Sequence, residues 1–275
     1  MDIFSNLQVV GECLLDKNRV EAFSSAISEV IEPGDVVIDC GTGSGIMSLL
    51  SARAGASKVY AVEIAEDVAQ FAKENVDASP YKDIVQVINS DIKDIKFDKK
   101  VDVVVAEMLD TGLVAEQQAQ AMNRLHELNV VSPKTKFIPY GVDNAIEAVE
   151  YDFNFYGFNM PFVIQARNFG AYEHVTKVLS PAVIYYQVNF EKPVDTKVSE
   201  IVDVTFTKNG LFNAIKLKTR TLLGPKTKVW GTSDMNMPVI IPVTPMVVKA
   251  GESVKVKIEY EMGEGFSNFF VDILK

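Results

Sequence analysis

Three glycines at alternate positions follow an apolar, β-type segment near the start of the chain. The segment VVIDC at 36–40 leads into Gly41, Gly43 and Gly45, and the helix-forming run IMSLLSARAG comes next. Glycine lets the backbone turn sharply and leaves no side chain between it and a ligand. The helix N-terminus beyond the turn offers unpaired N–H donors. This order of strand, glycine turn and helix is where a parallel α/β sheet holds a nucleoside-bearing cofactor.

Two acidic residues at predicted strand ends narrow the kind of cofactor. Asp39 precedes the first glycine by two residues, and the next apolar strand, KVYAVE, ends at Glu63. An acid at the latter position accepts hydrogen bonds from both ribose hydroxyls. The spacing G-x-G-x-G differs from the dinucleotide fingerprint G-x-G-x-x-G. The pattern therefore resembles class I S-adenosylmethionine methyltransferases, and an NAD-dependent dehydrogenase is the weaker alternative.

A second pair of carboxylates follows the apolar segment VDVVVA. The loop EMLDTGLVAE begins with Glu107 and ends with Glu116. Ligands of doubly wound sheets bind beyond the carboxyl ends of the strands, so we expect both acids beside the cofactor. No further metal ligands are evident nearby, and we predict no metal site. The two carboxylates could instead hold a guanidinium, which they match bidentately. The alternative is a solvated loop acid followed by an acid at a helix start.

Alternating helical and strand patterns must position these residues. Helical patterns at 16–31, 45–54, 66–76 and 114–129 alternate with apolar strand segments at 36–40, 58–63, 84–89 and 101–107. This alternation predicts a parallel sheet covered by helices on both faces.

Beyond the segment KFIPYG at 136–141 the pattern changes. Short, β-branched, alternating segments such as AIKLKTR and ESVKVKIEY are separated by Gly, Pro and Asn, as in a barrel or sandwich. We therefore predict a cofactor-binding domain at 1–138 and a mainly β domain at 139–275, with Pro139 in the linker.

Composition and charge restrict the partners and the location. The 275 residues are 48% hydrophobic and 23% charged, which argues against disorder. Their net charge is −10. No apolar run has the length of a membrane span, and the start MDIFSNLQVV lacks a signal-peptide design, so we expect a soluble, cytoplasmic protein without a membrane partner. The acidic balance disfavours RNA and favours cationic partners such as basic protein tails.

The cysteines and histidines are few. We expect Cys13 and Cys40 to stay reduced thiols. The histidines, His126 and His174, are too few for a zinc site or a histidine-centred triad. The helical pattern around His126 predicts a solvated side chain.

Six segments together resemble protein arginine methyltransferases over most of the chain: the glycine loop, the acid at Glu63, CLLDKNR at 13–19, AEMLDTGLVAE at 106–116, FIP at 137–139 and NFYGFNMP at 154–161. The resemblance implies a doubly wound, Rossmann-like α/β methyltransferase sheet followed by a mainly β, barrel-like domain. It implies S-adenosyl-L-methionine as the cofactor and methyl transfer to a guanidinium nitrogen of a basic protein or peptide. It also allows a homodimer.

The same resemblance assigns roles to individual residues. Glu107 and Glu116 would be the catalytic pair that holds the guanidinium. The cofactor would be bound by Arg19 at its methionine carboxylate, by Glu63 at its ribose, by Asp91 and Ile92 beside its adenine, and by the loop residues Asp39, Gly41, Gly43 and Gly45.

The chain also departs from the family pattern. We expect no counterpart of the family's tyrosine-rich N-terminal helix. Met108 replaces an aromatic residue, and GTSDMNM at 231–237 stands in place of the Thr-His-Trp loop. We expect nearby Trp230 to pack inside the barrel, and the insertion that forms the family's dimerisation arm is shortened around 165–180. Two alternatives follow: a methyltransferase that acts on RNA or a small molecule, and a non-catalytic S-adenosylmethionine-binding interaction module.

Overall fold

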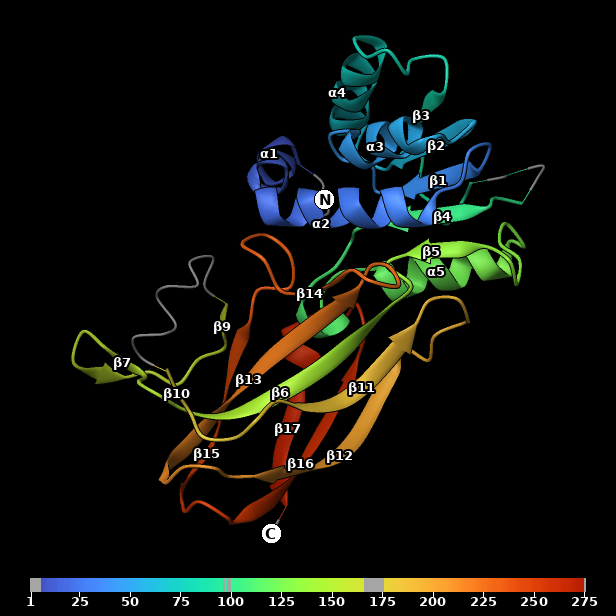
Figure 1. The fold of residues 1–275 in the computed structure, drawn as a ribbon. Helices are drawn as coiled ribbons and strands as arrows, with labels where there is room; N and C mark the ends of the chain where they lie inside the picture. Colours follow the sequence, from blue (N-terminus) through green and yellow to red (C-terminus); the bar gives the residue numbers. More distant parts are fainter. Residues whose placement is uncertain (1–5, 96, 98–99, 166–175, 275) are drawn as a thin grey trace.

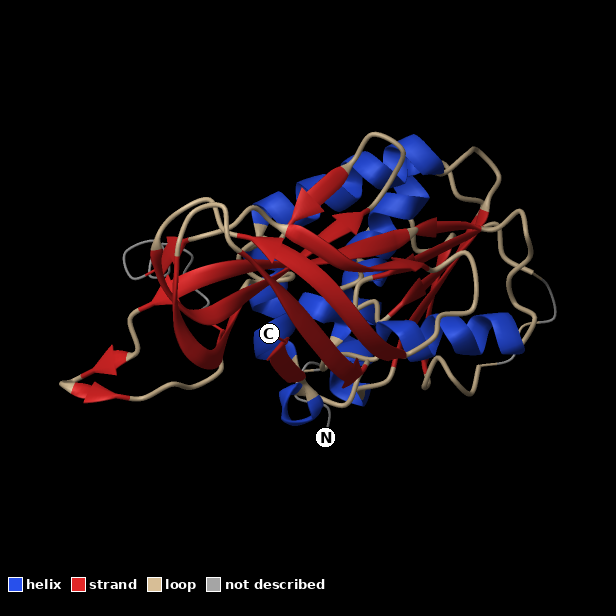
Figure 2. Cartoon of the chain, turned by 90° about the horizontal axis from the view of Figure 1, so that it is seen from below, coloured by secondary structure: helices blue, strands red, loops and turns tan. Residues whose placement is uncertain are grey.

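The computed structural model describes residues 6–95, 97, 100–165 and 176–274. A helix-rich first half lies above a strand-rich second half in Figure 1. Figure 2 shows the hairpin of β7 (Asn154–Phe155) and β8 (Phe158–Asn159) projecting from the strand-rich half.

Five parallel strands form the centre of the first half, in the order β3-β2-β1-β4-β5. This order confirms the predicted doubly wound, Rossmann-like sheet. The strands are β1 (Val36–Cys40), β2 (Lys58–Glu63), β3 (Val85–Asn89), β4 (Val103–Ala106) and β5 (Lys136–Ile138). The helices are α1 (Leu7–Leu15), α2 (Lys17–Val30), α3 (Ile46–Ala54), α4 (Glu66–Asp77) and α5 (Gln118–Glu127).

Local sequence explains where the helices nearest the site begin and end. Asp16 caps α2, because its Oδ1 accepts the N–H of Arg19 at 3.1 Å. Helix α3 lies between Gly45 and Gly55, whose φ angles are +84° and +115°, a backbone conformation that favours glycine. The glycine turn therefore fixes where α3 starts relative to β1.

The second half consists mainly of antiparallel strands. Its larger sheet follows the order β10-β6-β13-β15-β9, with β11 paired to β6 and β14 to β13. A smaller sheet has the order β12-β16-β17. With the two-stranded sheet of β7 and β8, these pairings of the described strands give three sheets and no closed ring. The strands are β6 (Gly141–Tyr151), β9 (Ile164–Gln165), β10 (Thr176–Val178), β11 (Val183–Asn189), β12 (Lys197–Thr205), β13 (Gly210–Leu222), β14 (Lys228–Trp230), β15 (Val239–Val248), β16 (Ser253–Glu261) and β17 (Phe270–Leu274).

Several details differ from the sequence-based expectations. Helix α1 was not predicted, and α5 begins at Gln118 instead of 114. The reason for the late start is that the backbone N–H groups of Val114, Ala115 and Glu116 point to the side chain of Asp110. A turn therefore replaces the first helical residues.

Two side-chain expectations were wrong. Trp230 does not pack inside the sheets: it is 37% exposed, and Lys218 Nζ lies 4.7 Å from its ring centroid. His126 is partly buried rather than solvated, since its Nε2 lies 2.9 Å from the carbonyl oxygen of Phe190 and its ring stacks on Phe137. Both rings have found partners on neighbouring elements, which a local pattern does not contain.

The expected shortening of the arm around 165–180 falls largely on residues 166–175, outside the described part of the chain. Within the described residues, no helix is both long and apolar enough to span a bilayer.

Candidate active site

A cavity of about 740 Å³ opens at the carboxyl ends of the parallel strands. Helix α1 and the segment 231–237 contribute to its walls, together with the glycine turn and the loop 107–116. Nine of the ten predicted cofactor-binding and catalytic residues line it: Arg19, Asp39, Gly41, Gly43, Glu63, Asp91, Ile92, Glu107 and Glu116. Gly45 does not, because it is the residue that caps α3. The fold thus gathers almost the whole predicted set in one place.

The glycine turn is held by two acids, Asp39 near the end of β1 and Glu63 at the end of β2. Glu63 accepts the N–H of Gly43 through Oε2 at 3.1 Å. Asp39 accepts the hydroxyls of Thr42 and Ser48 through Oδ2, at 2.6 and 2.7 Å. Burial raises the pKa of Asp39, and these two hydroxyls oppose the rise. Thr42 and Ser48 were not predicted from the sequence; their spacing from Asp39 was the available signal.

The adenine side of the predicted set lies at the end of β3. Asp91 fixes its own turn by accepting the N–H of Lys93 at 2.8 Å, and neighbouring Ile92 is buried.

Glu107 already binds a guanidinium, that of Arg19. Arg19 Nε lies 2.9 Å from Glu107 Oε2, Nη2 donates to the same oxygen, and Nη1 donates to the carbonyl oxygen of Cys13 at 3.0 Å. Both side chains of the ion pair are only 9% exposed. Burial raises the pKa of Glu107, and the charge of Arg19 opposes that rise.

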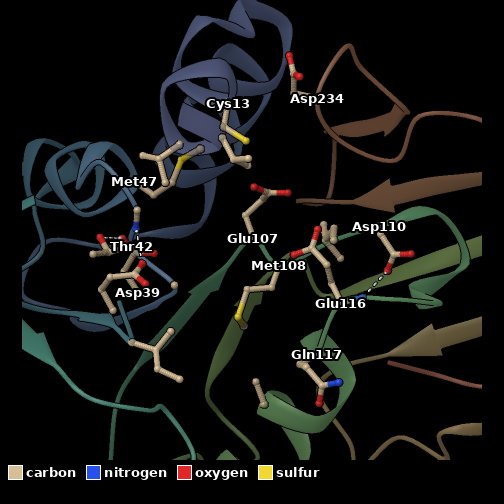
Figure 3. A pocket seen from close by; sticks show the side chains of 18 of the residues that line it. Cys13, Asp39, Thr42, Met47, Glu107, Met108, Asp110, Glu116, Gln117 and Asp234 are labelled. Carbon is tan, nitrogen blue, oxygen red and sulfur yellow. Dashed lines mark hydrogen bonds between the residues drawn. The ribbon is translucent and has the colours of Figure 1, made fainter. Parts of the chain in front are cut away.

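Asp110, between the two glutamates, organises their loop. Its Oδ2 accepts the N–H groups of Val114 and Ala115 at 3.1 and 2.9 Å, and its Oδ1 accepts that of Glu116 at 3.0 Å. In Figure 3 a dashed line joins Asp110 to neighbouring Glu116, and the side chains of Glu107 and Glu116 face the same space. Burial raises the pKa of Asp110 to about 6 although these N–H groups oppose the rise. This role was missed from the sequence.

The segment 231–237 contacts the start of α2 through another buried acid, Asp16. Asp16 Oδ2 accepts the hydroxyl of Thr232 and, at 2.9 Å, the N–H of Asp234. Asp16 therefore joins α1, α2 and this segment of the second half. The side chain of Asp234 lies near Cys13 in Figure 3. Burial raises the pKa of Cys13 to about 12, so its thiol stays protonated at neutral pH.

The lining fits S-adenosylmethionine in size and chemistry. Gly41 and Gly43 have φ angles of +70° and +54° and present bare backbone to the cavity. Acids end β1 and β2, and Arg19 offers a cation for a carboxylate. The volume lies within the range of sites for small ligands. No group of three or more His, Cys, Asp or Glu residues suited to a metal ion occurs among the described residues.

Comparisons with known proteins point to methyltransferases. Residues 23–132 match the family model of ribosomal protein L11 methyltransferase (PrmA). Uncharacterized protein MJ1452 of Methanocaldococcus jannaschii is 33% identical over 260 residues, which cover 94% of each chain. Protein arginine N-methyltransferase PRMT10 of Oryza sativa subsp. japonica is 42% identical over 115 residues, 41% of this chain and 30% of that protein.

The fold has relatives among solved structures. That of the Trypanosoma brucei PRMT1 enzyme-prozyme heterotetrameric complex with AdoHcy matches with a TM-score of 0.80 at 18% identity, over 94% of this chain and 89% of that chain. Fold, cavity and family model together define an S-adenosylmethionine-dependent methyltransferase of the type that resembles protein arginine methyltransferases. The chain belongs to the family of MJ1452. It is a divergent member of the class of methyltransferases that resemble protein arginine methyltransferases.

The glycine turn gives a first test of the cavity. We expect Gly43→Val to weaken S-adenosylhomocysteine binding about tenfold or more, because the side chain would enter the cavity and distort a turn that needs positive φ. Isothermal titration calorimetry measures the change. Gly251→Val is the matched control, since Gly251 has a φ of +91° in open space outside the cavity. Equal affinity in the Gly43 variant and the wild type would remove the turn from the binding site.

Asp110 gives a test by pH. Its pKa rises from 3.8 to about 6 on folding, so its contribution to stability is full below the lower value and is lost as the pH rises through the upper one. Between about pH 7.5 and about pH 4.5 we therefore expect the wild type to gain about 2 kcal/mol relative to Asp110→Asn. Urea unfolding of both proteins at the two pH values measures this gain. A difference that is independent of pH would contradict the assignment.

Proposed function

We propose that the chain transfers a methyl group from S-adenosyl-L-methionine to a guanidinium nitrogen of a basic protein or peptide. The observation that carries the proposal is that Glu107 and Glu116 belong to one loop and line the same cavity as the glycine turn. The contact between Arg19 and Glu107 supports it, because it is a guanidinium bound at this carboxylate. The acidic net charge of −10 also suits a cationic substrate.

Two units share the work in this proposal. Residues 1–138 would bind the cofactor through Arg19, Asp39, Glu63, Asp91, Ile92 and the turn at Gly41 and Gly43, with Gly45 as the cap of α3 that follows. Residues 139–275 would bind the substrate or a partner. Self-association of two copies stays a prediction; the heterotetrameric assembly named for the trypanosome structure supports it. A cytoplasmic location also stays a prediction, consistent with the two free cysteines.

The two carboxylates do their work by positioning. Arginine stays protonated in proteins, so the chain must orient a weak nucleophile. S-adenosylmethionine, when bound, supplies an electrophilic methyl group on a sulfonium sulfur. Glu107 and Glu116 hold the guanidinium plane and so fix the direction of one terminal nitrogen. Such orientation contributes up to about 7–11 kcal/mol in favourable cases.

Charge and proton transfer complete the role of this loop. The carboxylates stabilise positive charge as it moves onto the substrate, and their effect is larger where water is excluded. The substrate loses one N–H proton when its nitrogen gains a methyl group. Glu116, or a water bound to it, accepts that proton. The segment 231–237 contains no histidine to act as the base.

The direct experiment incubates cell extract and the protein with isotope-labelled S-adenosylmethionine and locates the label by mass spectrometry. Label on arginine nitrogens supports the proposal. Label on RNA or a small molecule supports the corresponding alternative, and no label on any acceptor supports a non-catalytic binding module.

Removal of one carboxylate tests whether Glu107 and Glu116 hold the guanidinium of the substrate. We expect Glu107→Gln to lower methyl transfer about a hundredfold or more, while S-adenosylhomocysteine binds at least as well because Arg19 loses its competing partner. A radiolabelled methyl assay and calorimetry measure the two effects. Asp203→Asn is a control for the lost charge, since this side chain is 70% exposed on β12. Unchanged turnover would remove Glu107 from the mechanism.

The ion pair predicts an order of binding. Arg19 occupies Glu107, and a carboxylate ligand of Arg19 would weaken that hold. We therefore expect an arginine peptide to bind about tenfold more tightly with S-adenosylhomocysteine present than without it. In Arg19→Ala the two affinities should converge. Equal affinities in the wild type would show that Arg19 does not compete for Glu107.

A further inference from the structure

Asn236 carries a buried acceptor without a donor at the edge of the proposed substrate site. The residue is only 3% exposed, and its Nδ2 donates to Thr221 Oγ1 at 2.7 Å. Its Oδ1 has no hydrogen-bond partner among the described residues. A buried polar atom in this state costs free energy unless a ligand or a water satisfies it.

The place of this atom singles it out. Two other buried side-chain atoms lack partners in the described part of the chain, those of Gln120 and Thr176. Of the three residues, Asn236 alone lines the large cavity. The residue that carries the orphaned acceptor therefore lines the pocket that also contains both glutamates.

The backbone around Asn236 is held against the glutamate loop. Thr111, in the loop 107–116, donates its hydroxyl to the carbonyl oxygen of Met237. Thr232 donates its N–H to the carbonyl oxygen of Met235 at 2.7 Å, which closes a turn just before Asn236. Asn236 itself has a φ of +53°, a conformation that asparagine tolerates better than most residues. The amide is thus fixed from both sides.

A guanidinium needs more acceptors than the two glutamates supply. It has five N–H groups in a plane, and a carboxylate binds it bidentately along one edge. If Glu107 accepts the edge formed by the two terminal nitrogens and Glu116 accepts a single outer N–H of a terminal nitrogen, Nε–H, on the side of the substrate chain, still needs an acceptor. An amide oxygen satisfies this donor without adding a third negative charge.

We propose that Asn236 Oδ1 accepts the Nε–H of the substrate arginine and thereby makes the site specific for an intact guanidinium. This assignment rests on the proposed function, and it gives the segment 231–237 a role in recognition. Asn236 would be a specificity-determining residue, whereas Glu107 and Glu116 orient the reacting nitrogen.

The test compares two glycine-flanked peptides, one with arginine and one with arginine methylated at Nε, which lacks this donor. Binding is measured by calorimetry in the presence of S-adenosylhomocysteine. We expect the wild type to prefer the ordinary peptide about tenfold or more, the range for a buried hydrogen bond. In Asn236→Ala the ordinary peptide should weaken about tenfold and the preference should vanish. Asn236→Asp, which keeps an acceptor oxygen, should retain the preference.

Asn213→Ala is the matched control. Both amide atoms of Asn213 are bonded to the backbone of Tyr151, outside the large cavity. This variant should keep the preference even if its melting temperature falls. A preference that survives in Asn236→Ala, or is absent from the wild type, would overturn the assignment while methylation of the arginine peptide upholds the proposed function. Failure of the wild type to bind or methylate either peptide would overturn both.

Discussion

The carboxylate of Asp110 holds the loop on which the site depends. It accepts three consecutive backbone N–H groups that would otherwise need water or another acceptor, because the first N–H groups of a helix have no partner within it. These bonds replace the first turn of a longer α5 and bring Glu116 back toward Glu107. The cost is a fully desolvated acid, which is visible in its raised pKa. The buried carboxylate of Asp110 thus lowers the free energy of unfolding, while its hydrogen bonds fix the shape of the loop 107–116.

The same loop is anchored by the second half of the molecule. The N–H of Gly112 donates to Thr219 Oγ1 at 2.7 Å, and its carbonyl oxygen accepts the hydroxyl of Tyr260 at 2.7 Å. Thr219 belongs to the larger antiparallel sheet and Tyr260 to the smaller one. Both sheets therefore hold one glycine of the loop from two directions. The strand-rich half is a structural part of the site and more than an appended binding surface.

The ion pair of Arg19 and Glu107 ties the first helices to this arrangement. A buried pair of this kind is weak evidence for stability, because desolvation offsets much of the attraction. Removal of either partner, however, destabilises the protein, because it leaves an uncompensated buried charge. In the function proposed above, the guanidinium of the substrate would replace Arg19 at Glu107. Asp16, three residues before Arg19, joins the start of α2 to the segment 231–237.

The amino-acid sequence by itself determined the parallel sheet, the glycine turn and the acids at strand ends. These features depend on local patterns: apolar strands, glycines that need positive φ, and carboxylates at fixed distances from them. The sequence also named nine of the residues that line the cavity. It could not give the start of α5, the exposed position of Trp230, the pairing of Arg19 with Glu107 or the orphaned oxygen of Asn236. The pairing of Arg19 with Glu107 joins groups that lie 88 residues apart in the chain. The start of α5 depends on which acceptor the N–H groups after Asp110 find, and only the tertiary structure decides which donor meets which acceptor.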